Sequence, residues 1–411
     1  MRRLLKKYLY IADITVFLTL LVLTSFYMYK VFHNQTLLEG YDLNTYANII
    51  DKWRNVFFID SYPIMSDTAK IILSINNNAG VALAATVTLY NVLTIVVAKF
   101  FFEVETKKKM LSTFMAFALV YVSMLYSHIL YGYGIHYRYL GVWSPNPWHS
   151  GSYITCKPFA IVAFILGAKT LEKYEEELTA YSKQGINYVK YILLIISMIL
   201  VTLAKPSYTL IHGGAISLVL LYRLIKTKFR NIKATFLLGL CYLPTLLVLI
   251  RQNYLIYGEE AETSEPLQEV SGIGVELFRG WKYCDNIPLA IILAALFPFV
   301  MLIIHYREII KNRLYAFSWE IYLVGLVSVL LLYETGVRED HCNMFWGYMI
   351  GLLIVYVSSL LLLINDTNLK YLIYNGVRYR VVVCIEWIFM LAHLLSGLLY
   401  FYYIYIGQST N

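Results

Sequence analysis

Long apolar segments recur along this chain and restrict its possible folds more than any other feature. About 20 residues of helix are needed to cross the hydrocarbon core of a bilayer, and segments of that kind occur from one end of the sequence to the other. Charged residues make up only 15% of the 411 residues and hydrophobic residues 59%, whereas soluble domains contain about 25% charged residues. We therefore predict an integral membrane protein that forms a single all-α domain, a polytopic helical bundle.

We expect eleven transmembrane helices. The first follows the basic start MRRLLKK, and its length and the lack of a small-residue cleavage site favour a retained helix over a signal peptide. The predicted spans are 10–31, 79–101, 111–131, 156–171, 187–204, 209–225, 234–251, 288–306, 316–333, 344–364 and 380–403.

Lysine and arginine are distributed unevenly between the two sides of these segments. With the N-terminus in the cytoplasm, 22 of them fall on the cytoplasmic side and 10 on the outer side. Short cytoplasmic loops are enriched in basic residues, so this asymmetry predicts a plasma-membrane protein with its N-terminus inside. An odd number of spans then places the C-terminus outside. The net charge of +8 reflects this topology and does not indicate nucleic-acid binding.

The first outer loop, residues 33–78, carries the first candidate catalytic groups. Its sequence YDLNTYANIIDKWRNVFF repeats apolar residues at spacings of three and four, which predicts an amphipathic helix on the membrane surface. Asp42 stands at the start of this helix, near the mouth of the first span. It is either an N-cap or a general base, and Asp60 is a second candidate carboxylate.

The third outer segment, HYRYLGVWSPNPWHSG at residues 136–151, is polar, aromatic and stiff. Its two prolines prevent helix formation and restrict the backbone. The two tryptophans offer flat apolar faces that suit sugar rings, and the histidines and arginine offer hydrogen-bond donors. An interfacial plug with solvated polar groups is the alternative. The candidate substrate-binding residues are His136, Arg138, Trp143, Trp148 and His149.

Two further outer turns place charges next to apolar segments. Lys205 precedes a proline between two spans, where it either snorkels to the surface or binds a lipid-linked phosphate as a point charge. The turn YETGVREDHCNMFWGYM, residues 333–349, holds many polar groups close to hydrocarbon, and a functional site is the default expectation for such groups. Its candidates are Glu334, Arg338, His341, Asn343 and Trp346.

The remaining segments offer fewer candidates. The outer loop 252–287 is rich in glutamate and is interpreted as a lid-like segment. The sequence contains no Walker A or GxGxxG motif. Glu386 and His393 lie seven residues apart in the last span, where they either pair or mark a proton path. We expect no cofactor, although the outer carboxylates leave room for a divalent metal ion.

This arrangement resembles the GT-C superfamily of membrane glycosyltransferases, which use polyprenyl-phosphate-linked sugars. In that family a first span leads into a long outer loop of surface helices, and a carboxylate near the start of this loop is the catalytic base. Basic residues on later outer loops hold the lipid phosphate. The resemblance implies Asp42 as the base and Lys205, Arg138 or Arg338 as phosphate partners.

A second resemblance concerns the RxxHxN pattern of Arg338, His341 and Asn343, which is similar to outer-loop residues of O-antigen polymerases and ligases. Those proteins share the polyprenyl-linked substrate class. Together the resemblances imply an inverting transfer of a sugar from a polyprenyl phosphate to a glycan, lipid or protein acceptor of a bacterial cell envelope. The alternatives are a polysaccharide polymerase or ligase, a transporter or flippase with polar groups at the bilayer midplane, and a scaffold without a shared outer pocket.

Overall fold

The chain is described by a computed structural model that covers residues 2–126, 143–179, 188–257, 272–279, 284, 286–336, 339, 343–368 and 376–407. Almost all of these residues are helical. The helices are α1 (Arg2–Leu37), α2 (Asp42–Lys52), α3 (Pro63–Asn76), α4 (Ala79–Thr106), α5 (Lys109–Tyr121), α7 (Gly151–Glu177), α8 (Tyr188–Ala204), α9 (Pro206–Lys226), α10 (Ile232–Leu240), α11 (Leu243–Tyr257), α12 (Ile287–Ile304), α13 (Glu308–Lys311), α14 (Arg313–Leu331), α15 (Met344–Asp366) and α17 (Val377–Tyr405). Two short strands, β1 (Ile273–Val275) and β2 (Leu332–Glu334), pair antiparallel with Ile273 opposite Glu334.

The predicted helical membrane bundle is confirmed. Among the residues that the structure describes, eight helices are long and apolar enough to cross a bilayer: α1, α4, α7, α9, α12, α14, α15 and α17. The pair α10 and α11 also passes this test but is bent by 48° at a break. The two other predicted spans overlap with α5 and α8, which have 13 and 17 residues, and α5 ends at Tyr121, ten residues before the predicted end of the span 111–131. At about 1.5 Å per residue, α5 is too short for a hydrocarbon core of about 30 Å.

Helix α15 lies at the centre of the bundle. The most apolar stretch of this helix is buried along its whole length. Because no side of the helix faces solvent, it is apolar on every side rather than amphipathic. It packs most extensively on α14 and begins with a GxxxG sequence at Gly347 and Gly351. A Cβ atom at Gly351 would lie 3.1 Å from the Cα atom of Tyr322 in α14. Small residues at this spacing therefore allow the two backbones to approach closely.

Helix α12 is broken near its middle by Pro298. Proline has no N–H group, and its ring crowds the carbonyl group four residues earlier, which here belongs to Ala294. That carbonyl accepts a hydrogen bond from the Tyr356 hydroxyl at 2.9 Å. The neighbouring carbonyl of Leu293 accepts one from the backbone N–H of Leu125 at 2.9 Å. The non-helical chain after α5 therefore restores a hydrogen bond that the break removes.

His393 of α17 contacts both the broken part of α12 and the chain that follows α5. Its Nε2 atom accepts a hydrogen bond from the backbone N–H of Phe297 at 3.2 Å, and its Nδ1 atom lies 2.7 Å from the carbonyl oxygen of Ser123. Both contacts are satisfied by a neutral ring with its proton on Nδ1. Glu386 bonds to His305 at 2.9 Å, so the alternative in which Glu386 pairs with His393 is wrong.

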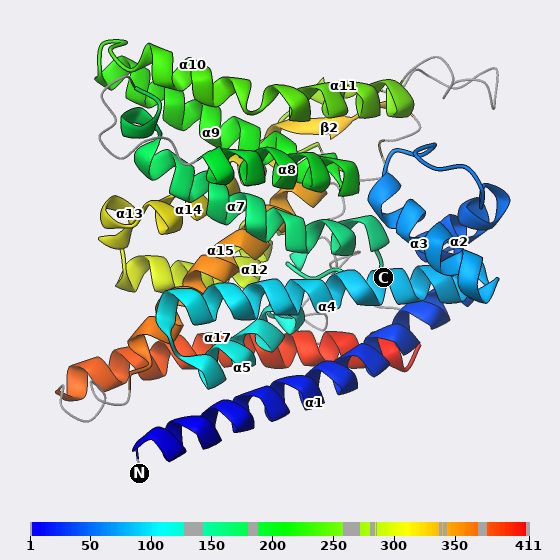
Figure 1. Cartoon of the computed structure of the whole chain (residues 1–411), viewed down its shortest axis with the longest axis horizontal. Coiled ribbons are helices and arrows are strands. Elements are labelled where there is room, and N and C mark those ends of the chain that lie inside the picture. The colour runs from blue at the N-terminus through cyan, green and yellow to red at the C-terminus, as the bar shows by residue number, and fades with distance from the viewer. Residues whose placement is uncertain are drawn as a thin grey trace.

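The bundle has two distinct ends (Figure 1). At the Asp42 end, helices α2 and α3 follow the end of α1, and α2 buries Leu43, Ala47 and Ile50 as one face against the bundle. The opposite end, which we name the His305 end, carries α13 and the last residue of α15, Asp366. The 23 residues of α15 span about 35 Å between these ends.

Candidate functional site

Lys205 is the central cation of the Asp42 end. It joins α8 to α9 and has an extended backbone, φ −164°, as expected for the residue before a proline. Its side chain is buried, with only 4% of the residue exposed, so the snorkelling alternative is wrong. The ammonium donates a hydrogen bond to Ser152 Oγ at 2.9 Å. It lies 4.4 Å from the centre of the Trp346 ring and 5.0 Å from that of Tyr62.

Four ionisable groups from separate segments interact around this position. Burial lowers the pKa of Lys205 to about 8, and the nearby carboxylates of Asp42 and Glu334 act in the opposite direction. Burial also lowers the pKa of His149, with Asp42 raising it and Lys205 lowering it further. A neutral His149 at pH 7 follows. We name Asp42, His149, Lys205 and Glu334 the Lys205 cluster.

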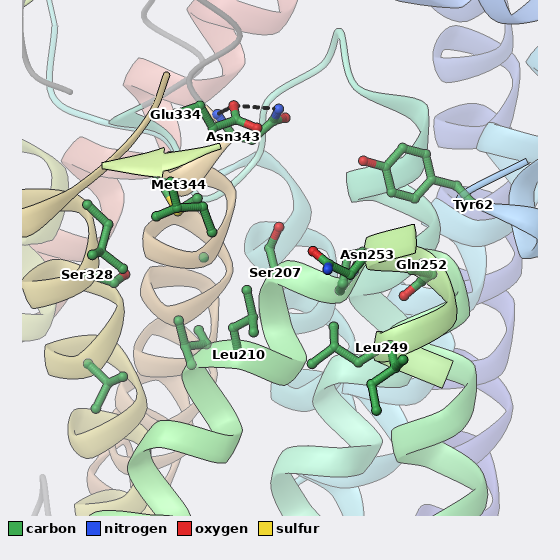
Figure 2. A pocket seen from close by; sticks show the side chains of 17 residues that line it. Tyr62, Ser207, Leu210, Leu249, Gln252, Asn253, Ser328, Glu334, Asn343 and Met344 are labelled. Atoms are coloured by element: carbon green, nitrogen blue, oxygen red, sulfur yellow. Dashed lines mark hydrogen bonds between the residues drawn. The ribbon is translucent and has the colours of Figure 1, made fainter. Parts of the chain in front are cut away.

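Next to this cluster lies a cavity of about 590 Å³ between α9, α11, α14 and α15. Figure 2 shows Tyr62, Glu334 and Asn343 at one end of it and leucines such as Leu210 and Leu249 at the other. Glu334 Oε2 accepts hydrogen bonds from Asn343 Nδ2 at 2.7 Å and from the Asn343 backbone at 3.3 Å. The cavity therefore has a polar rim and apolar walls, which suits an amphiphilic ligand.

Gln252 of α11 connects the cavity to the first outer loop. Its Nε2 atom donates to the carbonyl oxygens of Ser61 at 2.7 Å and Thr202 at 2.8 Å. Its Oε1 atom is buried and has no hydrogen-bond partner among the described residues. A buried polar atom without a partner is costly.

The two predicted carboxylates have different surroundings. Asp42 is exposed and is the first residue of α2, whose N-cap is Tyr41. The N-cap interpretation of Asp42 is therefore wrong, although a carboxylate in the first turn still interacts favourably with the helix dipole. Asp60 Oδ1 accepts a hydrogen bond from the backbone N–H of Tyr62 at 2.9 Å, so one of its oxygens stabilises the turn before α3.

Trp143 and Trp148 are buried, at 2% and 1% exposure. Trp143 packs edge-to-face on Phe345, with ring centres 5.3 Å apart, and Trp148 packs on Phe401 at 4.6 Å. Neither ring offers a free face to a sugar, contrary to the expectation from the sequence. Trp346, in contrast, faces both Lys205 and His149, and its ring centre lies 5.7 Å from that of His149.

The proline-containing loop before α7 is a buried plug that packs against the end of α5. The amide of Asn146 donates to the carbonyl oxygens of Leu119 at 2.7 Å and Val122 at 2.9 Å, where α5 ends. The buried Lys157 donates to Asn146 Oδ1 at 3.1 Å. These bonds satisfy carbonyl groups that the end of a helix leaves free. They attach the loop to the end of α5 and thereby fix the position of His149, which lies in the same loop. The plug is buried rather than solvated.

Four predicted site residues, His136, Arg138, Arg338 and His341, lie outside the described residues. Sequence reasoning missed Tyr62, Ser152 and Gln252. None of the three carries a charge, so no feature of the sequence marks them. A comparison with models of known protein families finds no match, and no curated protein matches the sequence.

Proposed function

We propose that the protein is a glycosyltransferase that uses a polyprenyl-phosphate-linked sugar at the Asp42 end of the bundle, on the outer face of the plasma membrane. The observation that carries this proposal is the cavity with apolar walls and a polar rim beside the Lys205 cluster. Its walls suit part of a prenyl chain, and the hydrogen-bonding groups of Tyr62, Glu334 and Asn343 at its rim suit a sugar. The excess of basic residues on the other side supports this orientation.

The Lys205 cluster supplies the groups that such a reaction needs. The acceptor hydroxyl loses its proton to Asp42 while its oxygen attacks the anomeric carbon of the sugar. The bond between that carbon and the phosphate oxygen breaks, and polyprenyl phosphate leaves with the bonding electron pair. A single displacement of this kind inverts the anomeric centre. Lys205 stabilises the negative charge that develops on the phosphate.

Tyr62 controls the approach to Lys205. Its ring lines the cavity on one side and lies 5.0 Å from the Lys205 ammonium on the other. Direct contact between a phosphate and Lys205 therefore requires the Tyr62 side chain to turn aside. Before that movement, Lys205 acts on the phosphate through its electrostatic field, which is strong because the site is buried.

One observation favours transfer over transport. The transporter alternative needs polar groups that are available near the bilayer midplane. Glu386 and His393 are the main polar groups that the sequence places within the last span. The two ring nitrogens of His393 are occupied by Phe297 N–H and the Ser123 carbonyl, and Glu386 bonds to His305. A polymerase or ligase would use the same end of the bundle and the same donor class, and it remains the second candidate.

A photoactivatable polyprenyl phosphate tests the lipid site. The purified protein in nanodiscs is illuminated with this probe, and the labelled peptides are identified by mass spectrometry. We expect labels on α9 and α11 that unmodified polyprenyl phosphate displaces. Ser207→Trp fills the cavity and should abolish labelling, whereas Leu218→Trp is the matched control because Leu218 lies on the same helix and is 60% exposed. Equal labelling of both variants would rule out this cavity.

A further inference from the structure

Three metal-ligating side chains meet at the His305 end, far from the Lys205 cluster. His305 follows the last residue of α12, Asp366 is the last residue of α15, and Glu386 lies in α17. His305 Nε2 lies 2.9 Å from Glu386 Oε1 and 3.0 Å from Asp366 Oδ2. One donor atom from each residue lies within 4.8 Å of the other two.

Burial makes this cluster unusual. Glu386 is fully buried, and its Oε2 atom has no hydrogen-bond partner among the described residues. A buried carboxylate oxygen without a partner costs several kcal/mol unless a cation or a donor reaches it. The side chains of His305 and Asp366 are 17% and 27% exposed, so an ion has access from the bundle end.

The surroundings of the cluster attract a cation. The end of a helix where free carbonyl groups gather carries a partial negative charge, and His305 follows the end of α12, which is of this kind. Lys108 donates to the carbonyl oxygens of Ile364 at 2.6 Å and Asn365 at 2.8 Å, and its charge also interacts with Asp366. It thus closes the end of α15 and forms no hydrogen bond with Glu386.

The donor set selects the class of ion. One imidazole nitrogen with carboxylate oxygens suits a divalent transition metal such as Zn²⁺ better than Mg²⁺ or Ca²⁺, which prefer oxygen ligands alone. A tetrahedral Zn²⁺ site with bonds of about 2.0–2.2 Å places donor atoms about 3.3 Å apart. The His305 contacts of 2.9 and 3.0 Å need to open by only a few tenths of an ångström. Two carboxylates then balance the charge of the ion.

We propose that His305, Asp366 and Glu386 form a Zn²⁺ site that joins the ends of α12, α15 and α17. Three protein ligands leave the fourth position of a tetrahedral ion to water, and the site lies about 35 Å along α15 from the cavity. This inference is independent of the proposed glycosyl transfer. The ion replaces the hydrogen bonds that His305 makes in its absence and gives the buried Glu386 Oε2 a partner.

Zn²⁺ binding to the purified full-length chain tests the proposal. The chelator-treated protein is titrated in detergent against a chromophoric Zn²⁺ chelator, and Co²⁺ is bound in parallel for its visible absorption. We expect one tight site per chain and a tetrahedral Co²⁺ spectrum. Glu386→Gln keeps the shape of the side chain but removes its charge, and it should weaken Zn²⁺ binding at least about 100-fold, beyond what outer-shell changes cost.

Two further variants separate the loss of Zn²⁺ binding from a failure to fold. Asp366→Asn alters a partly exposed ligand and should weaken Zn²⁺ binding even if Glu386→Gln fails to fold. Glu308→Gln is the matched control, since Glu308 lies three residues from His305 but outside the cluster, and it should bind Zn²⁺ like the wild type. Zn²⁺ should raise the unfolding temperature of the wild type and Glu308→Gln alone. Equal binding by the wild type and Asp366→Asn, or no binding by the wild type, would overturn the proposal and leave a metal-free ion triad.

Discussion

The ammonium group of Lys205 lies 4.4 Å from the centre of the Trp346 ring. This contact ties the junction of α8 and α9 to the first turn of the central helix α15. It also holds a positive charge in a buried position, where the charge interacts with Asp42 and Glu334. A cation over an aromatic face gains about 2 kcal/mol when desolvated, so Trp346 helps to keep Lys205 charged where water is scarce.

Removal of the Lys205 charge should therefore impair the proposed transfer. Lys205→Met keeps most of the side-chain volume but supplies no charge, and we expect kcat/KM for a polyprenyl-phosphate-linked sugar to fall at least about 100-fold. The measurement is the release of polyprenyl phosphate, followed by mass spectrometry. Activity of Lys205→Met near the wild-type value would exclude Lys205 as the phosphate partner.

The pH dependence of substrate binding should follow Lys205. With a pKa of about 8, Lys205 is charged at pH 7 and mostly neutral at pH 9. KM for the lipid donor should therefore rise between these pH values. Folding stability should rise over the same pH range, because the unfolded lysine keeps its proton up to about pH 10.4 and stability rises with pH wherever the unfolded chain binds more protons.

Lys205→Arg is the control for this pH effect, because guanidinium stays charged throughout the range. If Lys205→Arg retains activity, its KM should be flat between pH 7 and 9. A rise in KM of the same size in both proteins would assign the pH effect to a group other than Lys205.

Asp42 is the candidate base whose loss should affect chemistry more than stability. Asp42 is exposed and lies after the N-cap position, which Tyr41 occupies, so Asp42→Asn should change the unfolding temperature only slightly. General base catalysis typically contributes 10²–10⁴-fold, and we expect the rate of transfer to fall by at least 10²-fold. Asp51→Asn in the same helix is the control, since Asp51 forms an exposed ion pair with Arg54. If both variants are equally active, Asp42 is not the base.

The orientation of the bundle is accessible to reporter fusions. Alkaline phosphatase is active only outside the cytoplasm, so a fusion after residue 270 should be active and a fusion after residue 230 inactive. The expected topology follows from the excess of basic residues on one side. The reverse pattern would place the Lys205 cluster in the cytoplasm and contradict the proposed extracytoplasmic reaction.

The helical segments were predictable because apolar runs of membrane length have few alternatives to helix. The ends of the helices were harder to predict from the sequence. The predicted span 111–131 corresponds to α5, which ends at Tyr121. Nothing in residues 122–126 predicts this end, because it depends on partners far along the chain. Asn146 bonds to the last carbonyls of α5, and a Cβ atom on Gly397 of α17 would lie 1.6 Å from the carbonyl oxygen of Tyr121.

The candidate site was predictable in part for a related reason. Charged residues beside apolar segments, such as Asp42 and Lys205, need partners or water and therefore attract attention in a sequence. Tyr62 and Ser152 give no such signal, since their importance arises only from contact with Lys205 in the fold. His305 follows an apolar segment and resembles an ordinary interfacial residue until α12, α15 and α17 bring it to two carboxylates.

The close packing of α14 on α15 leads to a last prediction. A Cβ atom at Gly325 of α14 would lie 3.1 Å from the carbonyl oxygen of Gly347 and 3.2 Å from the Cα atom of Tyr348. Both neighbours are backbone atoms of the central helix, so neither is able to rotate away. Gly325→Ala should therefore destabilise the protein by about 1–3 kcal/mol, the usual cost of overpacking.

Gly213→Ala in α9 is the control, because its Cβ atom would meet no atom within 4 Å and alanine favours the helix by about 0.5–1 kcal/mol. Thermal unfolding in detergent should thus separate the two variants in opposite directions from the wild type, and a Gly325→Ala protein as stable as Gly213→Ala would show that the two helices do not pack through their glycines.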